Sequence, residues 1–453
     1  MTAHNQEANP GDPMLLSRKF PAAAAAILAL VVAVRLWSVQ GLMRPVRIVG
    51  ASMAETLRGA HIRLPCGDCG FPGRYDAERP PTDNRVVCPN CGHVNRDLVR
   101  AQRLPGQRVL VDRLAYRYHS PRRWDVIAIR SRDDPDYLEV KRVVGLPGER
   151  ISIRQGDIYV DGRIARKTLP QLRDTAVLVH DSGFEPDGTR DLPARWRAAA
   201  DSRWTRSARG FRWASNLPRG TESDWLTYHQ WRCFASPLPR SDEYAVLDHY
   251  GYNSDESRQL HRVRDLLLVA HLRLDDETDG GGSVMLRGYD GQAWCRAVLE
   301  FPARRASLWR GGDRMMSAEL PPAAYAQHVR LDFALFDRQV VLAVDERVVL
   351  VWQIDKEAGL GQADRASDAT ASSCPFGIAA EGVCVSICRL QVYRDVHYLD
   401  PRGLGRDWDA PTLASDEVLV LGDNVPVSRD SRHWEQPGVP AARILGPVLR
   451  FGE

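Results

Sequence analysis

The stretch from residue 137 to residue 153 places a lysine among branched apolar residues, where it could act as a base. Two short strands, 137–144 and 150–153, are predicted around the turn residues Gly145-Leu-Pro-Gly148. Burial of Lys141 in the first strand would remove water from its ammonium group, and desolvation lowers a lysine pKa from its usual value of about 10.4. A neutral lysine at pH 7 can accept a proton as a general base. The alternative, a lysine on the solvent face of an edge strand, is favoured by this stretch alone.

A serine in a predicted tight turn is the second candidate for chemistry. Residues 46–50 alternate in a way that predicts a strand, and Gly50-Ala51 would turn the chain and leave Ser52 exposed at the strand end. A serine in this position can attack a carbonyl, while its own backbone N–H points into an oxyanion site. The same serine can be a helix N-cap that forms a capping box with Glu55, and the two roles are compatible.

A polar loop near the end of the chain supplies groups that could support such chemistry. The predicted strand 418–421 leads into a loop rich in Asp, Asn, Ser and Arg. Asp430 and Arg432 can form an ion pair, and Ser428 can exchange a hydrogen bond with a nearby amine. A solvated turn is the alternative interpretation of the loop.

Four cysteines form two Cys-x-x-Cys pairs that are separated by eighteen residues. Each pair can present two thiolates to one ion, and two pairs complete a tetrahedral site, which predicts a structural zinc ribbon. Because four protein ligands leave no open position, this zinc would not be catalytic, and no cofactor is expected for catalysis. Two disulfides are the competing interpretation for a segment outside the cytoplasm. The cysteines are Cys66, Cys69, Cys88 and Cys91.

The elements that must position these residues are predicted to be short strands. Residues 104–168 have the pattern of a compact antiparallel β unit with a hairpin turn at Asp161-Gly162. Residues 170–400 contain many short Trp-bearing strands at regular spacing, which indicates a β-sandwich similar to concanavalin-like jelly rolls. The Trp residues could be sugar-stacking platforms, but the pattern favours core positions for most of them. The predicted fold class is therefore mainly β.

Length and charge set broader limits. A chain of 453 residues is too long for one hydrophobic core and predicts two or three domains. A formal net charge of +3 is close to neutral and gives no indication of a nucleic-acid partner. Nine cysteines are an odd number, which does not fit a simple secreted disulfide framework.

Residues 20–43 are predicted to form a transmembrane anchor. Fifteen uncharged residues run from Phe20 to Val34, and extension to Leu42 gives a helix of about 31–35 Å, which matches a hydrocarbon core of about 30 Å. Arg35 lies past the midpoint and can reach the interface. A cleaved signal peptide and a buried helix of a soluble protein are the alternatives. Basic residues flank both ends of the run, so charge alone leaves the orientation open.

Four stretches, in this order, resemble the type I signal peptidases, a family of membrane-anchored Ser/Lys proteases. The resemblance covers residues 41–63, 104–169 and 415–453 and excludes the predicted zinc ribbon and sandwich. The stretches that carry it are Gly50-Ala-Ser-Met53, residues 107–112 with Tyr116, residues 139–149, and residues 421–424 continued by 428–432.

The resemblance implies a role for individual residues. Ser52 would attack the scissile carbonyl, Lys141 would be the general base, and Ser428 would hydrogen-bond and orient Lys141. Gly50 stands where some members carry a serine that contributes to the oxyanion hole, so the hole would rest mainly on the Ser52 backbone N–H. The residues expected to form supporting ion pairs are Arg142, Asp423, Asp430 and Arg432.

The resemblance also implies an activity and a location. Signal peptides would be removed from secreted preproteins at Ala-x-Ala-like sites through an acyl-enzyme. The chain would cross the cytoplasmic membrane once, contacting lipid, with its catalytic domain on the extracytoplasmic side. The 170–414 insertion could bind a carbohydrate or a protein, and no nucleic-acid partner is expected. The alternative function is a membrane-tethered carbohydrate-binding or surface protein that uses an inactive protease core as a scaffold.

These interpretations divide the chain into seven consecutive segments. They are a disordered cytoplasmic N-terminus (1–19), a transmembrane anchor (20–43), a nucleophile segment (44–63), a zinc-ribbon-like insertion (64–103), a general-base segment (104–169), a β-sandwich-like insertion (170–414) and a final catalytic segment (415–453).

Overall fold

The protein is described from a computed structural model that is mainly β, which confirms the predicted predominance of strands. The predicted disordered terminus lies, apart from Lys19, outside the described residues. The residues that the structure describes are 19–134, 136–186, 193–207, 210–213, 224–235, 242–274, 282–354 and 370–450.

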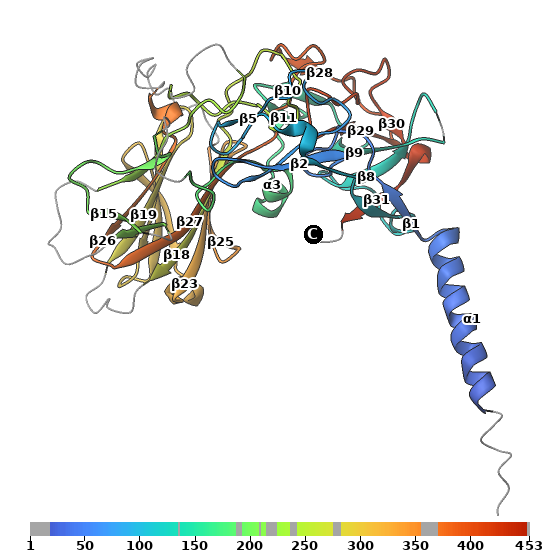
Figure 1. Cartoon of the computed structure of the whole chain (residues 1–453), viewed down its shortest axis with the longest axis horizontal. Coiled ribbons are helices and arrows are strands. Elements are labelled where there is room, and N and C mark those ends of the chain that lie inside the picture. Colours follow the sequence, from blue (N-terminus) through green and yellow to red (C-terminus); the bar gives the residue numbers. More distant parts are fainter. Residues whose placement is uncertain are drawn as a thin grey trace, which may run out of the picture.

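Three segments that are far apart in the sequence build one antiparallel seven-stranded sheet, in the order β1-β7-β31-β8-β9-β29-β30 (Figure 1). Within it, β9 lies between β8 and β29, so both of its backbone edges are paired. Among the described strands, β1 pairs with β7 alone and therefore forms one edge. The bounds are β1 Met43–Arg47, β7 Arg108–Asp112, β8 Val126–Arg130, β9 Leu138–Gly145, β29 Glu417–Leu421, β30 Val439–Pro440 and β31 Ile444–Arg450.

A smaller four-stranded sheet packs beside β9 and β29 through a shared apolar core. Ile151 and Ile153 of this sheet are buried in the same core as Leu419 and Leu421 of β29. The predicted hairpin turn is present, since Asp161 and Gly162 have positive φ angles between two paired strands. The bounds are β10 Ile151–Arg154, β11 Asp157–Val160, β12 Arg163–Ile164 and β28 Trp408–Asp409.

The segment that carries the four cysteines forms two small sheets around their side chains. Its Tyr75 and Ile62 are buried in a separate small core. The bounds are β2 His61–Pro65, β3 Pro72–Asp76, β4 Val86–Val87, β5 Val94–Asn95, the 3-10 helix η1 Leu98–Arg100 and β6 Gln102–Leu104.

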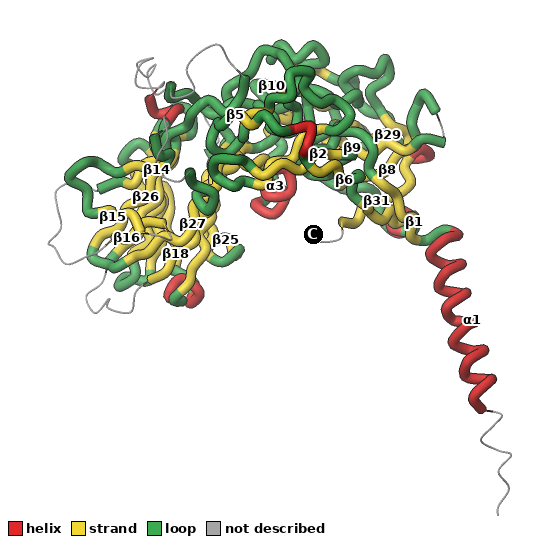
Figure 2. The backbone as a smooth tube through the Cα atoms, viewed as in Figure 1, coloured by secondary structure: helices red, strands yellow, loops and turns green. Residues whose placement is uncertain are grey.

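The long insertion is a two-sheet β-sandwich at the opposite end of the molecule from α1 (Figures 1 and 2). One sheet has the order β15-β16-β27-β18-β23-β24-β25, with β13 paired to β27, and the other has the order β14-β17-β26-β19-β20-β21-β22. Trp196, Trp204 and Trp213 are buried in the core between the sheets, as the sequence pattern favoured. The bounds are β13 Val177–Asp181, β14 Trp196–Arg197, β15 Trp204–Ser207, β16 Gly210–Trp213, β17 Leu226–Tyr228, β18 Leu266–Leu274, β19 Ser283–Tyr289, β20 Trp294–Glu300, β21 Arg305–Arg310, β22 Asp313–Glu319, β23 His328–Phe336, β24 Gln339–Val344, β25 Arg347–Gln353, β26 Phe376–Glu381 and β27 Val385–Arg394.

Helices are few, and the longest, α1, stands clear of the rest of the protein (Figure 1). None of the helices in the described residues combines the length and the apolar character that a membrane span requires. Residues 51–57 form consecutive turns, so Ser52 does not cap a helix there. The bounds are α1 Lys19–Gln40, α2 Ala115–Tyr118, α3 Leu169–Thr175, η2 Pro322–Tyr325 and η3 Ala441–Arg443.

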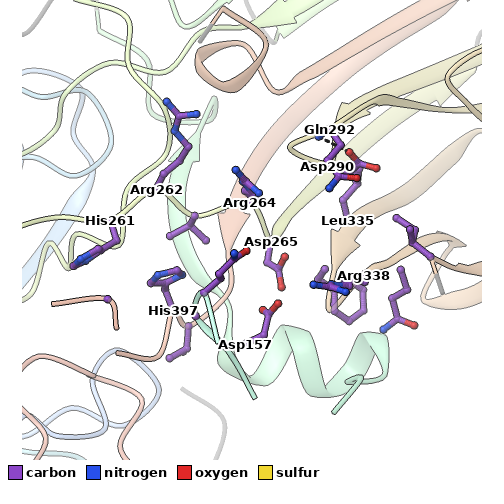
Figure 3. A pocket seen from close by; sticks show the side chains of 18 of the residues that line it. Asp157, His261, Arg262, Arg264, Asp265, Asp290, Gln292, Leu335, Arg338 and His397 are labelled. Atoms are coloured by element: carbon purple, nitrogen blue, oxygen red, sulfur yellow. Dashed lines mark hydrogen bonds between the residues drawn. The ribbon is translucent and has the colours of Figure 1, made fainter. Parts of the chain in front are cut away.

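Buried ion pairs connect the sandwich to the segment that follows the small four-stranded sheet. Lys167 forms ion pairs of 2.8 Å with both Asp337 and Asp395. Beside this group a cleft of about 560 Å³ opens, in which the carboxylates of Asp157 and Asp265 face each other (Figure 3). Burial and the nearby Asp337 carboxylate raise the pKa of Asp157 to about 7.

Candidate active site

Lys141 is buried in the centre of the large sheet. It lies on β9 opposite Ile127 of β8, and only 3% of its surface is exposed. Burial lowers the pKa of Lys141, although the Asp430 and Glu139 carboxylates act in the opposite direction. The structure therefore differs from the solvent-face alternative, and the loss of water around the buried amine favours its neutral form.

The Lys141 amine is held by one group from β9 and one from the loop that follows β29. Its Nζ donates to Ser428 Oγ at 3.4 Å and lies 3.8 Å from Glu139 Oε2. Gly422 makes room for this arrangement, because a Cβ there would lie 2.1 Å from Ser428 Oγ and 2.5 Å from Ser52 O. The sequence interpretation gave Gly422 no role, although its position inside the last motif was visible.

Ser52 and Lys141 line one cleft of about 740 Å³. The cleft runs along β1 and the turn that follows it, and the N-terminal end of β9 forms its opposite side. Gly50 also lines it, and a Cβ at Gly50 would meet no atom within 4 Å. The structure thus places Gly50 and Ser52 of the first motif and Lys141 of the third motif in one cleft.

The turn that carries Ser52 is held by Asn424, a fully buried residue that the sequence interpretation did not single out. The Asn424 backbone N–H donates to Ser52 O at 3.0 Å, and its side-chain Nδ2 donates to Ala51 O at 3.0 Å. The Asn424 backbone carbonyl also accepts the Ser428 N–H at 3.0 Å. One asparagine therefore fixes the Ser52 turn and the position of Ser428 together.

Two buried ion pairs fix the strands around Lys141. Arg142 donates to Asp423 with Nε–Oδ1 at 2.8 Å and Nη2–Oδ2 at 2.6 Å. Arg432 donates to Asp430 with both contacts at 2.8 Å. Burial raises the Asp430 pKa, but the Arg432 guanidinium, together with His433 and Lys141, holds that pKa well below its usual range. The four residues expected to form ion pairs are thus arranged as two bidentate pairs.

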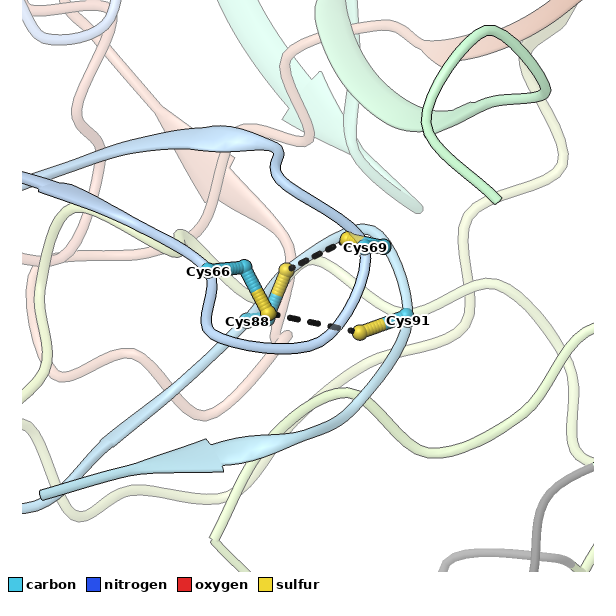
Figure 4. Close-up of side chains that lie close together, drawn as sticks. All are labelled: Cys66, Cys69, Cys88 and Cys91. Atoms are coloured by element: carbon cyan, nitrogen blue, oxygen red, sulfur yellow. Dashed lines mark hydrogen bonds between the residues drawn. The ribbon is translucent and has the colours of Figure 1, made fainter. Parts of the chain in front are cut away.

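The four patterned cysteines converge in space (Figure 4). All four are buried free thiols, with Sγ–Sγ distances of 3.7 Å between Cys66 and Cys91 and 3.8 Å between Cys69 and Cys88. A tetrahedral zinc site with Zn–S bonds of about 2.3 Å has edges of about 3.8 Å. The donor set and its spacing therefore fit a tetrahedral zinc ion, and the free thiols disagree with the disulfide interpretation.

A second group of potential ligands lies at the edge of the sandwich. His229 Nδ1 is 3.1 Å from Cys374 Sγ and 3.0 Å from Glu243 Oε1. The corresponding edges of a tetrahedral zinc site would be about 3.4–3.6 Å. Since the observed distances are shorter and Arg197 already pairs with Glu243, this group is a hydrogen-bonded cluster. The sequence offered no spacing that predicts it.

Part of the chain is similar to a known family of peptidases. Residues 93–265 match the profile of the family described as "Signal peptidase, peptidase S26". Signal peptidase I V of Bacillus subtilis (strain 168) is 30% identical over 79 residues, which are 17% of this chain and 46% of that protein. Signal peptidase I of Bacillus caldolyticus is 40% identical over 58 residues, 13% of this chain and 31% of that protein. The predicted type I signal peptidase resemblance is confirmed, and the chain spans less than half the length of these curated relatives.

Solved structures resemble the chain only weakly. The VIP36 exoplasmic/lumenal domain is 9% identical with a TM-score of 0.30, covering 49% of this chain and 92% of that one. The carbohydrate binding module CBM66 from Bacillus subtilis is 10% identical with a TM-score of 0.24, covering 45% of this chain and 94% of that one. Likenesses at this level carry no conclusion about function.

Proposed function

We propose that this chain is a type I signal peptidase that removes N-terminal signal peptides from secreted preproteins by means of Ser52 and Lys141. The observation that carries the proposal is the placement of Lys141. It is 3% exposed, its pKa is lowered by burial, and it lines the same cleft as Ser52. The match to the signal peptidase family over residues 93–265 supports the same activity.

The proposed reaction is acyl transfer to water. Neutral Lys141 takes the proton of the Ser52 hydroxyl, and the Ser52 oxygen attacks the scissile carbonyl. The Ser52 backbone N–H stabilises the oxyanion that forms, and protonated Lys141 passes its proton to the leaving amine. Lys141 then removes a proton from water, whose oxygen attacks the acyl carbonyl, and Lys141 returns that proton to the Ser52 oxygen as the acyl–Ser52 bond breaks. Ser428, at 3.4 Å from Nζ, keeps the amine aimed in one direction throughout.

The cleft is suited to a peptide in an extended conformation. β1 is an edge strand of the large sheet, and residues of β1 line the cleft. An extended chain can add to such an edge through main-chain hydrogen bonds, and pockets along it then select alternate side chains. We assign the Ala-x-Ala-like preference implied by the sequence resemblance to this edge.

We further propose that α1 attaches the protein to a membrane, with the catalytic sheet on the extracytoplasmic side. Ile27, Leu28 and Leu30 of α1 are between 63% and 65% exposed, and the helix stands clear of the sheets (Figure 1). Exposed apolar surface of this kind is stabilised by transfer into lipid. Since β1 begins at Met43, soon after α1 ends at Gln40, the cleft would be held close to the membrane surface.

A structural zinc ion held by Cys66, Cys69, Cys88 and Cys91 is a separate proposal, supported by the spacing of their sulfur atoms. Such an ion would tie β2 and β3 to β4 and β5 and supply rigidity rather than a catalytic group.

The test of the proposed activity is preprotein cleavage by the detergent-solubilised protein. Ser52→Ala and Lys141→Ala should each abolish cleavage, with unchanged circular dichroism, because each removes one reacting group. Ser317→Ala, on β22 of the sandwich, is the matched control and should cleave at the wild-type rate. Full activity in Ser52→Ala would contradict the proposal and favour the alternative of a binding protein with an inactive protease core.

A further inference from the structure

A short segment of the sandwich insertion reaches the loop that follows β29. The Tyr250 hydroxyl donates to Asp423 O at 2.6 Å, and both residues are buried. Asn253 and Asn424 exchange two side-chain hydrogen bonds, with Asn253 Nδ2 donating at 2.7 Å and Asn424 Nδ2 donating at 2.8 Å. The insertion is therefore in direct contact with the residue that holds the Ser52 turn.

This contact completes the hydrogen bonding of the Asn424 side chain. An asparagine amide has two N–H donors and one carbonyl oxygen. One Asn424 donor goes to Ala51 O, the other to Asn253 Oδ1, and the Asn424 oxygen accepts from Asn253 Nδ2. Because Asn424 is fully buried, loss of Asn253 would leave two polar groups of this amide without these bonds.

The Asn424 side chain in turn sets the direction of one peptide group. Ala51 O accepts from Asn424 Nδ2 and also from the Ala54 N–H of the same turn. The Ala51–Ser52 peptide bond is trans, and in a trans peptide the C=O and N–H point in opposite directions. The two hydrogen bonds to Ala51 O therefore hold the direction of the Ser52 N–H, and Asn424 supplies one of them. That N–H is the oxyanion donor of the proposed mechanism.

We propose that Asn253 of the insertion is a positioning residue for the oxyanion site, and that it acts through Asn424 on the Ala51–Ser52 peptide group. This inference rests on the proposed signal peptidase activity. It makes the sandwich insertion part of the active site rather than an appended domain. Tyr250, which binds the adjacent carbonyl of Asp423, supports the same loop.

The expected kinetic result follows from the position of the Ser52 N–H. That group contacts the oxyanion only once the oxyanion has formed, so its misalignment should lower kcat and leave KM nearly unchanged. Complete loss of one oxyanion donor costs about 10²–10³-fold in kcat. Since Asn253→Ala loosens the donor without removing it, we expect a loss of about 10–100-fold in kcat.

The experiment measures kcat and KM for preprotein cleavage by the full chain in four forms: wild type, Asn253→Ala, Asn424→Ala and the double variant. If Asn253 acts through Asn424, the double variant should be no slower than Asn424→Ala alone. Independent action of the two residues would instead make the two losses multiply. Gln339→Ala is the matched control, because Gln339 is a buried amide of the same insertion that donates to Lys167 O and does not line the Ser52 cleft.

The possible results separate a failure of the inference from a failure of the proposed function. Gln339→Ala should lower the thermal midpoint with kcat unchanged, which separates stability from catalysis. Tyr250→Phe removes one hydroxyl only, and a severalfold loss of kcat in this folded variant supports the inference if Asn253→Ala fails to fold. Wild-type kcat in Asn253→Ala, or losses that multiply in the double variant, would overturn the inference while the activity stands. A wild-type protein that cleaves nothing would overturn the proposed function and the inference with it.

Discussion

Replacement of Glu139 by Gln should move the acid limb of the pH–rate profile to lower pH. The acid limb of kcat/KM reports the pKa of the group that must be neutral, here Lys141. The Glu139 carboxylate raises that pKa, because it lies 3.8 Å from Nζ and favours the ammonium form. Glu139→Gln removes the negative charge and keeps the shape, so a lower Lys141 pKa is expected.

The size of the shift follows from the distance between the two atoms. Two unit charges at 3.8 Å interact by about 1.1 kcal/mol at an effective dielectric constant of about 80, and by about 4.4 kcal/mol at about 20. Since one pKa unit corresponds to about 1.4 kcal/mol, these limits are about 0.8 and 3 units. The Glu139 side chain is 19% exposed, so water screens part of its charge, and we expect a shift of about 1 unit.

The assay is kcat/KM for a peptide with an Ala-x-Ala site, measured from the plateau down through the acid limb. At pH values on the acid limb, the kcat/KM of Glu139→Gln should be about tenfold higher than that of wild type, because about tenfold more of its Lys141 is neutral. Glu319→Gln, an exposed carboxylate on β22, should leave the profile unchanged. An unchanged limb in Glu139→Gln, or a shift to higher pH, would refute the assignment of Lys141 as the base.

Two further predictions concern metal and membrane. The purified chain should contain one zinc ion by mass spectrometry, and Cys88→Ser should lower both the zinc content and the thermal midpoint. The control is Cys388→Ser, at an exposed cysteine, which should change neither. Disulfides among the four patterned cysteines would contradict the prediction. Full-length protein should float with phospholipid vesicles and a chain that starts at residue 43 should not, because it lacks the exposed apolar surface of α1. Equal flotation of the two chains would contradict the anchor. Protease protection of the catalytic sheet in sealed vesicles tests on which side of the membrane the sheet lies.

Local pattern was enough to single out the candidate residues. The motifs around Ser52, Lys141 and Ser428 are each only a few residues long, and a strand or a tight turn imposes its residue preferences over that distance. The two Cys-x-x-Cys pairs were visible for the same reason, since the ligand spacing within each pair is local. The alternation of short strands likewise indicated a mainly β chain.

Pairing between distant segments decided what local pattern left open. The stretch around Lys141 alone favoured a solvent-facing lysine, but β9 lies between β8 and β29, and the loop after β29 covers the amine. The turn after Ser52 was compatible with a helix cap, and the structure has no helix there. These outcomes depend on strand order, which periodicity within one strand does not specify.

The sequence by itself determined which side chains could react, because that information lies in residue type and short spacing. Only the tertiary structure decided which other groups hold these side chains in position. Asn253 and Asn424 are 171 residues apart, and Tyr250 and Asp423 are 173 residues apart. A hydrogen bond between such partners arises from how the sandwich packs against the catalytic sheet, and no periodicity in the chain encodes it. The buried amide that orients the Ser52 turn therefore became visible only once the insertion was placed in space.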